Sequence, residues 1–148
     1  MKIKTLKHSK FVTKSSSNEI NGFLVPIYNI HDQFFDKDTR PEQVYLTVIK
    51  KNSSKGPHLH YIRTGCFTCI KGNAAIILKI DEKYETFVSG EKHNFLSVLI
   101  PTGVPAMICN IDNNDAYIIN TPYPAWTPDM DDEHTADFSD YDINDLYK

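Results

Sequence analysis

The sequence has little positive charge in any one place. Its 16 lysines and arginines are outnumbered by 19 aspartates and glutamates, and the formal net charge is −3. The longest basic run is the pair Lys50 and Lys51, which is too short to follow a phosphate backbone. We therefore expect no nucleic-acid partner.

Long apolar runs are also missing. No segment approaches the roughly 18 uninterrupted apolar residues of a membrane-spanning helix. The first residues, Met1 to Lys14, lack the apolar stretch of a signal peptide. We therefore expect no membrane partner and a cytoplasmic location.

Cysteine is scarce as well. Three cysteines in a chain that shows no export signal do not predict a disulfide framework. Cys66 and Cys69 have the CxxC spacing that zinc and redox sites use in turns and at helix starts. Here the pair lies in a strand-like segment, where residues three apart point to opposite faces. We interpret both as small core residues.

The sequence is rich in β-forming segments. With 148 residues and 41% hydrophobic content it has the size of one domain with one core, and we expect a single domain over residues 1–148. The dominant hydrophobic period is two, in short segments rich in Val, Ile, Phe, Tyr and Thr. These segments are Gly22 to Tyr28, Gln43 to Lys50, Cys66 to Lys71, Ala74 to Ile80, Tyr84 to Val88, Leu96 to Ile100, Ala106 to Asn110 and Ala116 to Asn120.

Turn compositions separate the segments, among them Lys71-Gly-Asn73, Pro101-Thr-Gly103 and Asp112-Asn-Asn-Asp115. Many short strands joined by such turns predict an all-β sandwich or barrel, over about residues 22–121. No segment holds a persuasive helical period, apart from a short one at Ile143 to Tyr147.

The chain changes character after Thr121. Pro122, Pro124 and Pro128 exclude regular structure, and the acidic run Asp129-Met-Asp-Asp-Glu133 follows. We predict an irregular, proline-rich, acidic tail over residues 122–148 that wraps the barrel. We interpret the acidic run as a solvated surface, with metal binding or substrate contact as alternatives.

Two histidines form the most informative motif, in the segment Gly56-Pro-His58-Leu-His60. Side chains at i and i+2 of a strand project from the same face, so both imidazoles can enter one barrel interior. A second motif runs from the turn Ile100-Pro-Thr-Gly103 to Asn110, and it returns the chain to the same pocket at Ala106.

At these residues the chain resembles the cupin superfamily. The first cupin motif has an HxH pair, a glutamate and a glycine, and the second has a proline, a glycine, a histidine and an asparagine. The matching residues are His58, His60, Gly72, Pro101, Gly103 and Asn110. Gly65 and Ala106 stand where the family has its other two metal ligands. We therefore expect a jelly-roll β-barrel with no metal and no other cofactor.

Within the cupins, the chain resembles the metal-independent branch of nucleotide-sugar epimerases and isomerases. The segment Lys55 to His60 is similar to the base-carrying segment of the rhamnose-pathway 3,5-epimerases and to the Gly-x-His-x-His of sugar 3,4-ketoisomerases. The segments Asn120 to Trp126 and Asp132 to His134 resemble, more weakly, the closing segment of the epimerases. The resemblance implies a nucleoside-diphosphate sugar as substrate, with dTDP as the expected nucleotide, and a homodimer paired through an N-terminal strand.

The chemistry that this resemblance implies is enolisation beside a ketone. A neutral imidazole such as His58 can remove a proton next to the carbonyl of a 4-keto-6-deoxysugar, and a donor such as His60, Arg63 or Lys55 can stabilise the enolate. Return of the proton to the other face gives epimerisation at C3 or C5, whereas delivery to a different atom gives a 3,4-ketoisomerase. A cupin that binds the sugar nucleotide without turning it over is the non-catalytic alternative.

Four further residues are candidates for this site. Tyr123 lies two residues from the place of the epimerase acid, and Tyr45 can reach the pocket from its strand; each may equally be a packing aromatic. Trp126 can stack on a nucleotide base or plug the end of the barrel. Asn110, from the second motif, is a candidate for substrate binding together with Lys55 and Arg63.

Overall fold

The structure, a computed structural model, describes residues 1–147. The described chain contains twelve strands and one short helix. They are β1 (Thr5–Lys7), β2 (Phe11–Lys14), β3 (Ile20–Leu24), β4 (Tyr45–Ile49), β5 (Ser54–Leu59), β6 (Gly65–Lys71), β7 (Asn73–Ile80), β8 (Lys83–Gly90), β9 (Leu96–Ile100), β10 (Ala106–Asn110), β11 (Ala116–Asn120), β12 (His134–Thr135) and the 3-10 helix η1 (Ile143–Tyr147). No helix in this part of the chain is both long enough and apolar enough to span a membrane.

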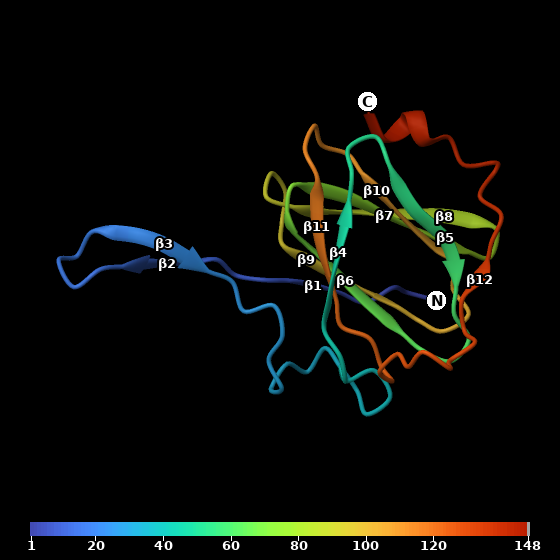
Figure 1. Cartoon of the computed structure of the whole chain (residues 1–148), viewed down its shortest axis with the longest axis horizontal. Coiled ribbons are helices and arrows are strands. Elements are labelled where there is room, and N and C mark those ends of the chain that lie inside the picture. Colours follow the sequence, from blue (N-terminus) through green and yellow to red (C-terminus); the bar gives the residue numbers. More distant parts are fainter. Residues whose placement is uncertain (148) are drawn as a thin grey trace.

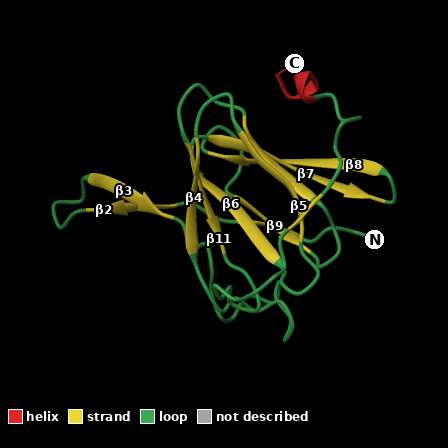
Figure 2. Ribbon diagram, turned by 45° about the vertical axis from the view of Figure 1, so that its right-hand side comes forward, coloured by secondary structure: helices red, strands yellow, loops and turns green. Residues whose placement is uncertain are grey.

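Two five-stranded antiparallel sheets form the body of the molecule (Figures 1 and 2). One has the order β1-β9-β6-β11-β4 and the other the order β12-β5-β10-β7-β8. Apolar side chains of both sheets fill the space between them, with Ile76 and Leu78 from β7 facing Val98 from β9 and Ile118 from β11, all fully buried. The protein is therefore an all-β jelly roll, as predicted.

Strand β7 is apolar on both faces, and the tail explains why. Ile76 and Leu78 point into the barrel core, whereas Ala75 and Ile77 point outward and are fully buried all the same. Their cover is Phe138, which the chain after β12 lays across the outer face of the sheet. A strand that is buried on both faces gives a continuous apolar run instead of an alternating one.

The cysteines are core residues, as interpreted. Cys66 packs with Phe35 and Leu99 on the outer face of its sheet, and Cys69 lies in the barrel core on the other face. Burial raises the pKa of each thiol to about 12. Both are free thiols.

The N-terminal part differs most from expectation. The edge strand β1 belongs to the barrel although it precedes the predicted range of 22–121, whereas β3 leaves the barrel and pairs only with β2. These two strands form a hairpin that projects from the body (Figures 1 and 2), and we call residues 11–24 the arm.

The tail is held to the barrel at several points. Strand β12 pairs with β5, and Lys79 Nζ on β7 donates to the backbone oxygen of Asp137 at 3.1 Å. Lys148, the last residue of the predicted tail, lies outside the described residues.

Candidate functional site

A cavity of about 250 Å³ opens between the two sheets. The apolar residues that line it include Phe67, Ile100, Val104 and Ile108. The polar residues that line it are Tyr45, Thr47, Lys55, His58, His60, Arg63, Thr64, Asn120 and Glu133. An apolar pocket with a few convergent polar groups is the usual form of a small-molecule site.

Gly56 allows the segment that carries His58 and His60 to approach this cavity. Its φ is +91°, and a Cβ at this position would lie 2.8 Å from the backbone oxygen of Ala106. Only glycine combines this backbone conformation with such a close approach. Strand β5 therefore lies tightly against β10, with His58 opposite Ala106.

The contacts of the His60 ring favour one tautomer. Its Nδ1 lies 2.8 Å from the backbone oxygen of Asp132, and a carbonyl oxygen can only accept, so Nδ1 carries the proton. Arg63 Nε lies 3.4 Å from the same Nδ1. That contact would need Nδ1 as an acceptor, and we assign the proton to Nδ1 because the contact with the carbonyl is the shorter of the two. Neutral His60 therefore keeps its lone pair on Nε2.

Several influences keep His60 neutral. Burial lowers its pKa, and the positive charge of Arg63 lowers it further, against opposing contributions from Asp132 and Glu133; the net pKa lies below the ordinary 6.5. The side chain is 25% exposed. A neutral imidazole with a free Nε2 can act as a general base near neutral pH.

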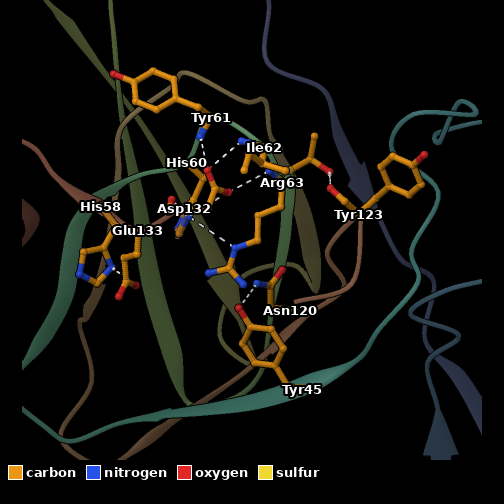
Figure 3. Close-up of polar contacts among 11 residues, drawn as sticks. Tyr45, His58, His60, Tyr61, Ile62, Arg63, Asn120, Tyr123, Asp132 and Glu133 are labelled. Atoms are coloured by element: carbon orange, nitrogen blue, oxygen red, sulfur yellow. Dashed lines mark hydrogen bonds and ion pairs between the residues drawn. The ribbon is translucent and has the colours of Figure 1, made fainter. Parts of the chain in front are cut away.

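Asp132 organises the loop that follows β5 (Figure 3). Its Oδ1 accepts the backbone N–H groups of Tyr61 and Ile62, each at 2.8 Å, and its Oδ2 accepts that of Arg63 at 3.0 Å. Burial alone would raise the pKa of this carboxyl, but the three N–H donors and the nearby His60 hold it below its ordinary value. Asp132 is therefore a buried carboxylate with a full set of partners.

His58 has a carboxylate partner from the same segment. Its Nδ1 lies 3.3 Å from Glu133 Oε1, and both side chains are partly exposed, at 42% and 61%. The pair lies at the mouth of the cavity, where solvent weakens its attraction. The contact orients the ring and, when Nδ1–H donates to the carboxylate, leaves Nε2 unprotonated.

Tyr45 reaches the cavity from the other sheet, and Asn120 orients it. Asn120 Oδ1 accepts the backbone N–H of Cys66 at 2.9 Å, so its Nδ2 donates to the Tyr45 hydroxyl oxygen (Figure 3). The Tyr45 oxygen is thus an acceptor in this contact, and its own O–H remains available as a donor. A tyrosine held in this way can donate a proton or a hydrogen bond to a ligand.

Three candidates from the sequence are not placed on the cavity wall. The ring of Tyr123 points away from the histidines, and its backbone pairs with Thr64 (Figure 3). Trp126 is 46% exposed, and its backbone N–H is bound by Gln43. Asn110 is 1% exposed: its Nδ2 donates to the backbone oxygens of Ile49 and Asn114, and its Oδ1 accepts the backbone N–H of Asp112. Asn110 thus bonds to the backbone and is not among the residues that line the cavity.

The residues present do not fit a cupin-type metal centre. Gly65 and Ala106 offer no side-chain donor atoms where the cupins have two of their metal ligands, so the two histidines lack the rest of that ligand set. Among residues 1–147, no group of three or more histidine, cysteine, aspartate or glutamate side chains could hold a metal ion. We derive no step through a metal.

Sequence reasoning missed Asp132, Glu133 and Asn120 as parts of the site. The acidic run was interpreted as a solvated surface, which is correct for Asp131 but wrong for Asp132, whose side chain is 3% exposed. The only sequence indication was the weak resemblance of Asp132 to His134 to the closing segment of the epimerases.

Comparisons with known proteins find solved structures with a similar fold. No protein-family model and no curated protein sequence matches the chain. Among solved structures, a dTDP sugar isomerase from Desulfovibrio desulfuricans G20 is similar, with a TM-score of 0.76 and 12% identity over 91% of this chain and 83% of that chain. The sugar 3,4-ketoisomerase QdtA from Thermoanaerobacterium thermosaccharolyticum, in complex with TDP, gives 0.67 and 16% over 98% and 91%.

A third similar structure is NovW, a 4-keto-6-deoxy sugar epimerase from the novobiocin gene cluster of Streptomyces spheroides. Its TM-score is 0.67 with 14% identity, over 88% of this chain and 67% of that chain. At these identities the likeness shows a shared fold. The all-β jelly roll predicted from the sequence is therefore confirmed, and these three proteins share it.

Proposed function

We propose that this protein is an isomerase of a nucleoside-diphosphate 4-keto-6-deoxysugar, which enolises the sugar beside its ketone. The observation that carries the proposal is His60, a neutral imidazole on the wall of a sugar-sized cavity with its proton fixed on Nδ1 and Nε2 free. Support comes from the names of three proteins with the same fold, all of which are sugar isomerases or epimerases.

The base is a histidine Nε2. It takes the proton from the carbon next to the ketone, the C–H electron pair becomes a C=C bond, and the carbonyl oxygen takes the negative charge. The sequence favoured His58 as this base. The structure favours His60, which is the more buried of the two, with His58 and Glu133 as a second pair at the mouth.

The enolate needs a donor other than His60. In its Nδ1–H form His60 has no proton on Nε2, so it cannot donate to an oxyanion as the sequence analysis had allowed. Arg63, Lys55 and the Tyr45 hydroxyl are the donors on the cavity wall that remain.

Two outcomes follow from one enolate. In a 3,4-ketoisomerase the proton leaves C3 and a proton returns to C4, while O3 loses its proton and O4 gains one, so the ketone moves. In an epimerase the proton returns to the same carbon from the opposite face, which requires an acid there. Because Tyr123 points away from the cavity, Tyr45 is the one tyrosine among the described residues that lines it. The placement of Tyr123 favours the ketoisomerase.

Replacement of Tyr45 tests which of the two reactions occurs. If the protein is an epimerase with Tyr45 as its acid, Tyr45→Phe should retain deuterium exchange but lower inversion by about 10²-fold or more. A ketoisomerase should keep its product and lose less rate. The measurement is the ratio of exchanged substrate to product by NMR, and equal losses of exchange and inversion would remove Tyr45 from the role of opposing acid.

The cavity accommodates the sugar and leaves the nucleotide outside. Its volume of about 250 Å³ is below the range of roughly 300–1,000 Å³ that holds a drug-sized ligand. The nucleoside diphosphate would therefore lie across the mouth, where Lys55 and Arg63 supply positive charge. A dTDP-linked substrate is the first choice, because QdtA has been crystallised with TDP and, as a variant, with TDP-4-keto-6-deoxyglucose.

The test is incubation of the protein in D₂O with dTDP-4-keto-6-deoxyglucose, followed by NMR of the sugar protons. Deuterium at C3 or C5, or a new 3-keto product, above the buffer control is expected. Binding without exchange, for this and other nucleoside-diphosphate keto sugars, would support the non-catalytic sugar-nucleotide-binding cupin instead.

We also propose that the protein is a homodimer whose arm packs on a second copy. Phe11 pairs with Leu24 on one face of the arm and Val12 with Phe23 on the other, and all four are 51–58% exposed. A two-stranded hairpin with apolar side chains half exposed on both faces is only marginally stable in water, so a cover would stabilise it. Strand β4 of a second copy could supply this cover, because it is a sheet edge and its outward side chains Leu46 and Val48 are exposed.

Substitutions that place charged side chains on the arm test whether the protein is a dimer. Val12→Asp with Phe23→Asp should convert a dimer into a monomer in light scattering coupled to gel filtration, because two carboxylates would be buried at the interface. Ile30→Asp is the matched control, since Ile30 is 64% exposed and lies outside the arm. A wild-type monomer, or a dimer that survives the double substitution, would contradict the proposal.

A further inference from the structure

The segment that carries Asp132 crosses the edge of the barrel and contacts both candidate bases. Asp132 touches His60, Glu133 touches His58, and β12 then pairs with β5 along Leu59 and His58. Beyond it, Phe138 is buried against the outer face of β7 and β10. This segment is therefore anchored at both ends and forms part of the wall of the site.

We propose that Asp132 is a positioning residue whose carboxylate, bound to the N–H groups of residues 61–63, holds its own backbone carbonyl against His60 Nδ1 and so leaves Nε2 as the free basic atom. This inference rests on the proposed function only for its consequence in catalysis. The tautomer itself is a property of the folded protein and can be measured without substrate.

The distances around His60 Nδ1 indicate which tautomer the neighbouring atoms favour. The carbonyl oxygen of Asp132 is at 2.8 Å, Asp132 Oδ2 at 3.7 Å and Arg63 Nε at 3.4 Å. One proton on Nδ1 satisfies the carbonyl and also faces the carboxylate. The opposite tautomer would set the Nδ1 lone pair against two oxygens, and only Arg63, which is farther from Nδ1 than the carbonyl oxygen is, would favour it.

The side chain of Asp132 is what keeps that carbonyl in place. Its three charge-assisted hydrogen bonds join the loop after β5 to the segment before β12 in a buried position, and β12 itself is only two residues long. Without the carboxylate, the loop and the segment would lose their shared anchor. The carbonyl would then move relative to the ring.

Arg63 belongs to the same arrangement. Its backbone N–H is bound by Asp132 Oδ2, its side chain lines the cavity, and its charge opposes protonation of His60. A single carboxylate thus places both a base and the cation that keeps this base neutral. A clamp that served stability alone would not need its backbone oxygen on the imidazole.

The experiment is long-range ¹H–¹⁵N correlation NMR of the full chain with ¹⁵N-labelled histidine, with the His60 signals assigned by His60→Gln. The variants are Asp132→Ala, Asp132→Asn and the matched control Asp131→Asn, because Asp131 is the exposed neighbour in the same acidic run. Wild type and Asp131→Asn should show only the Nδ1–H form at pH 7.5. Asp132→Ala should show a substantial share of the Nε2–H form, and Asp132→Asn an intermediate share.

Each outcome decides the proposal. A wild-type His60 in the Nε2–H form overturns it even if the variants fail to fold. A folded Asp132→Ala or Asp132→Asn protein, judged by its amide spectrum, that keeps the wild-type tautomer also overturns it. If the tautomer responds as expected but no nucleotide sugar exchanges deuterium, the positioning role stands and the proposed function fails.

Discussion

His60→Asn should lower the rate of deuterium incorporation into a 4-keto-6-deoxysugar by about 10²–10⁴-fold, the range that a positioned general base contributes. Asparagine keeps a hydrogen-bond donor near the carbonyl of Asp132 but has no group that can accept a proton at neutral pH. The measurement is the initial exchange rate in D₂O by NMR at saturating substrate, with binding followed separately by calorimetry. Binding should change far less than the rate.

The pH profile supplies a second check on the same residue. Because the pKa of His60 is lowered below 6.5 in the folded protein, its neutral form persists to lower pH than an ordinary histidine. The acidic limb of kcat/KM should therefore fall below pH 6.5. His93→Asn, at an exposed position outside the cavity, is the control and should leave both rate and profile unchanged. Full activity in His60→Asn would move the base to His58.

The sequence predicted most of what is local in the barrel. Hydrophobic period two gave β4 and the strands from β6 to β11, but not β5, which follows a turn-like composition. The i, i+2 spacing placed His58 and His60 on one wall, with Lys55 nearby. Such features depend on short-range backbone geometry, which a single sequence contains. The sequence also shows that Gly65 and Ala106 lack donor side chains at the two positions where cupins have their other metal ligands.

What the sequence did not predict depends on contacts between distant residues. His60 and Asp132 are separated by 72 residues, and Asn120 and Tyr45 by 75. An aspartate in an acidic run is usually solvated, and nothing near Asp132 in the chain distinguishes it from Asp131. The difference arises only when the tail folds back and three N–H groups of one loop converge on one carboxylate. The choice between His58 and His60 as base likewise required the burial and partners of each ring.

Asp132→Ala should destabilise the protein by about 3 kcal/mol at pH 7, since hydrogen bonds to a charged acceptor contribute roughly 1.5–3 kcal/mol each and the loop that donates them is partly solvated once released. The measurement is the free energy of unfolding from urea denaturation. Asp131→Ala is the control and should change it by less than about 0.5 kcal/mol, as is usual for an exposed site.

The difference in unfolding free energy between wild type and Asp132→Ala should depend on pH, in a direction set by the pKa of Asp132. The folded protein lowers this pKa below its unfolded value, so the stabilisation is fully present above about pH 4, the ordinary aspartate range, and is lost as the pH falls through the folded pKa. The gap between wild type and Asp132→Ala should therefore be largest at neutral pH and should narrow in acid. A gap that stays constant from pH 7 to pH 3 would mean that the carboxylate charge does not hold the loop, and that the segment carrying both acidic partners of the histidines is anchored by its apolar contacts at Phe138 instead.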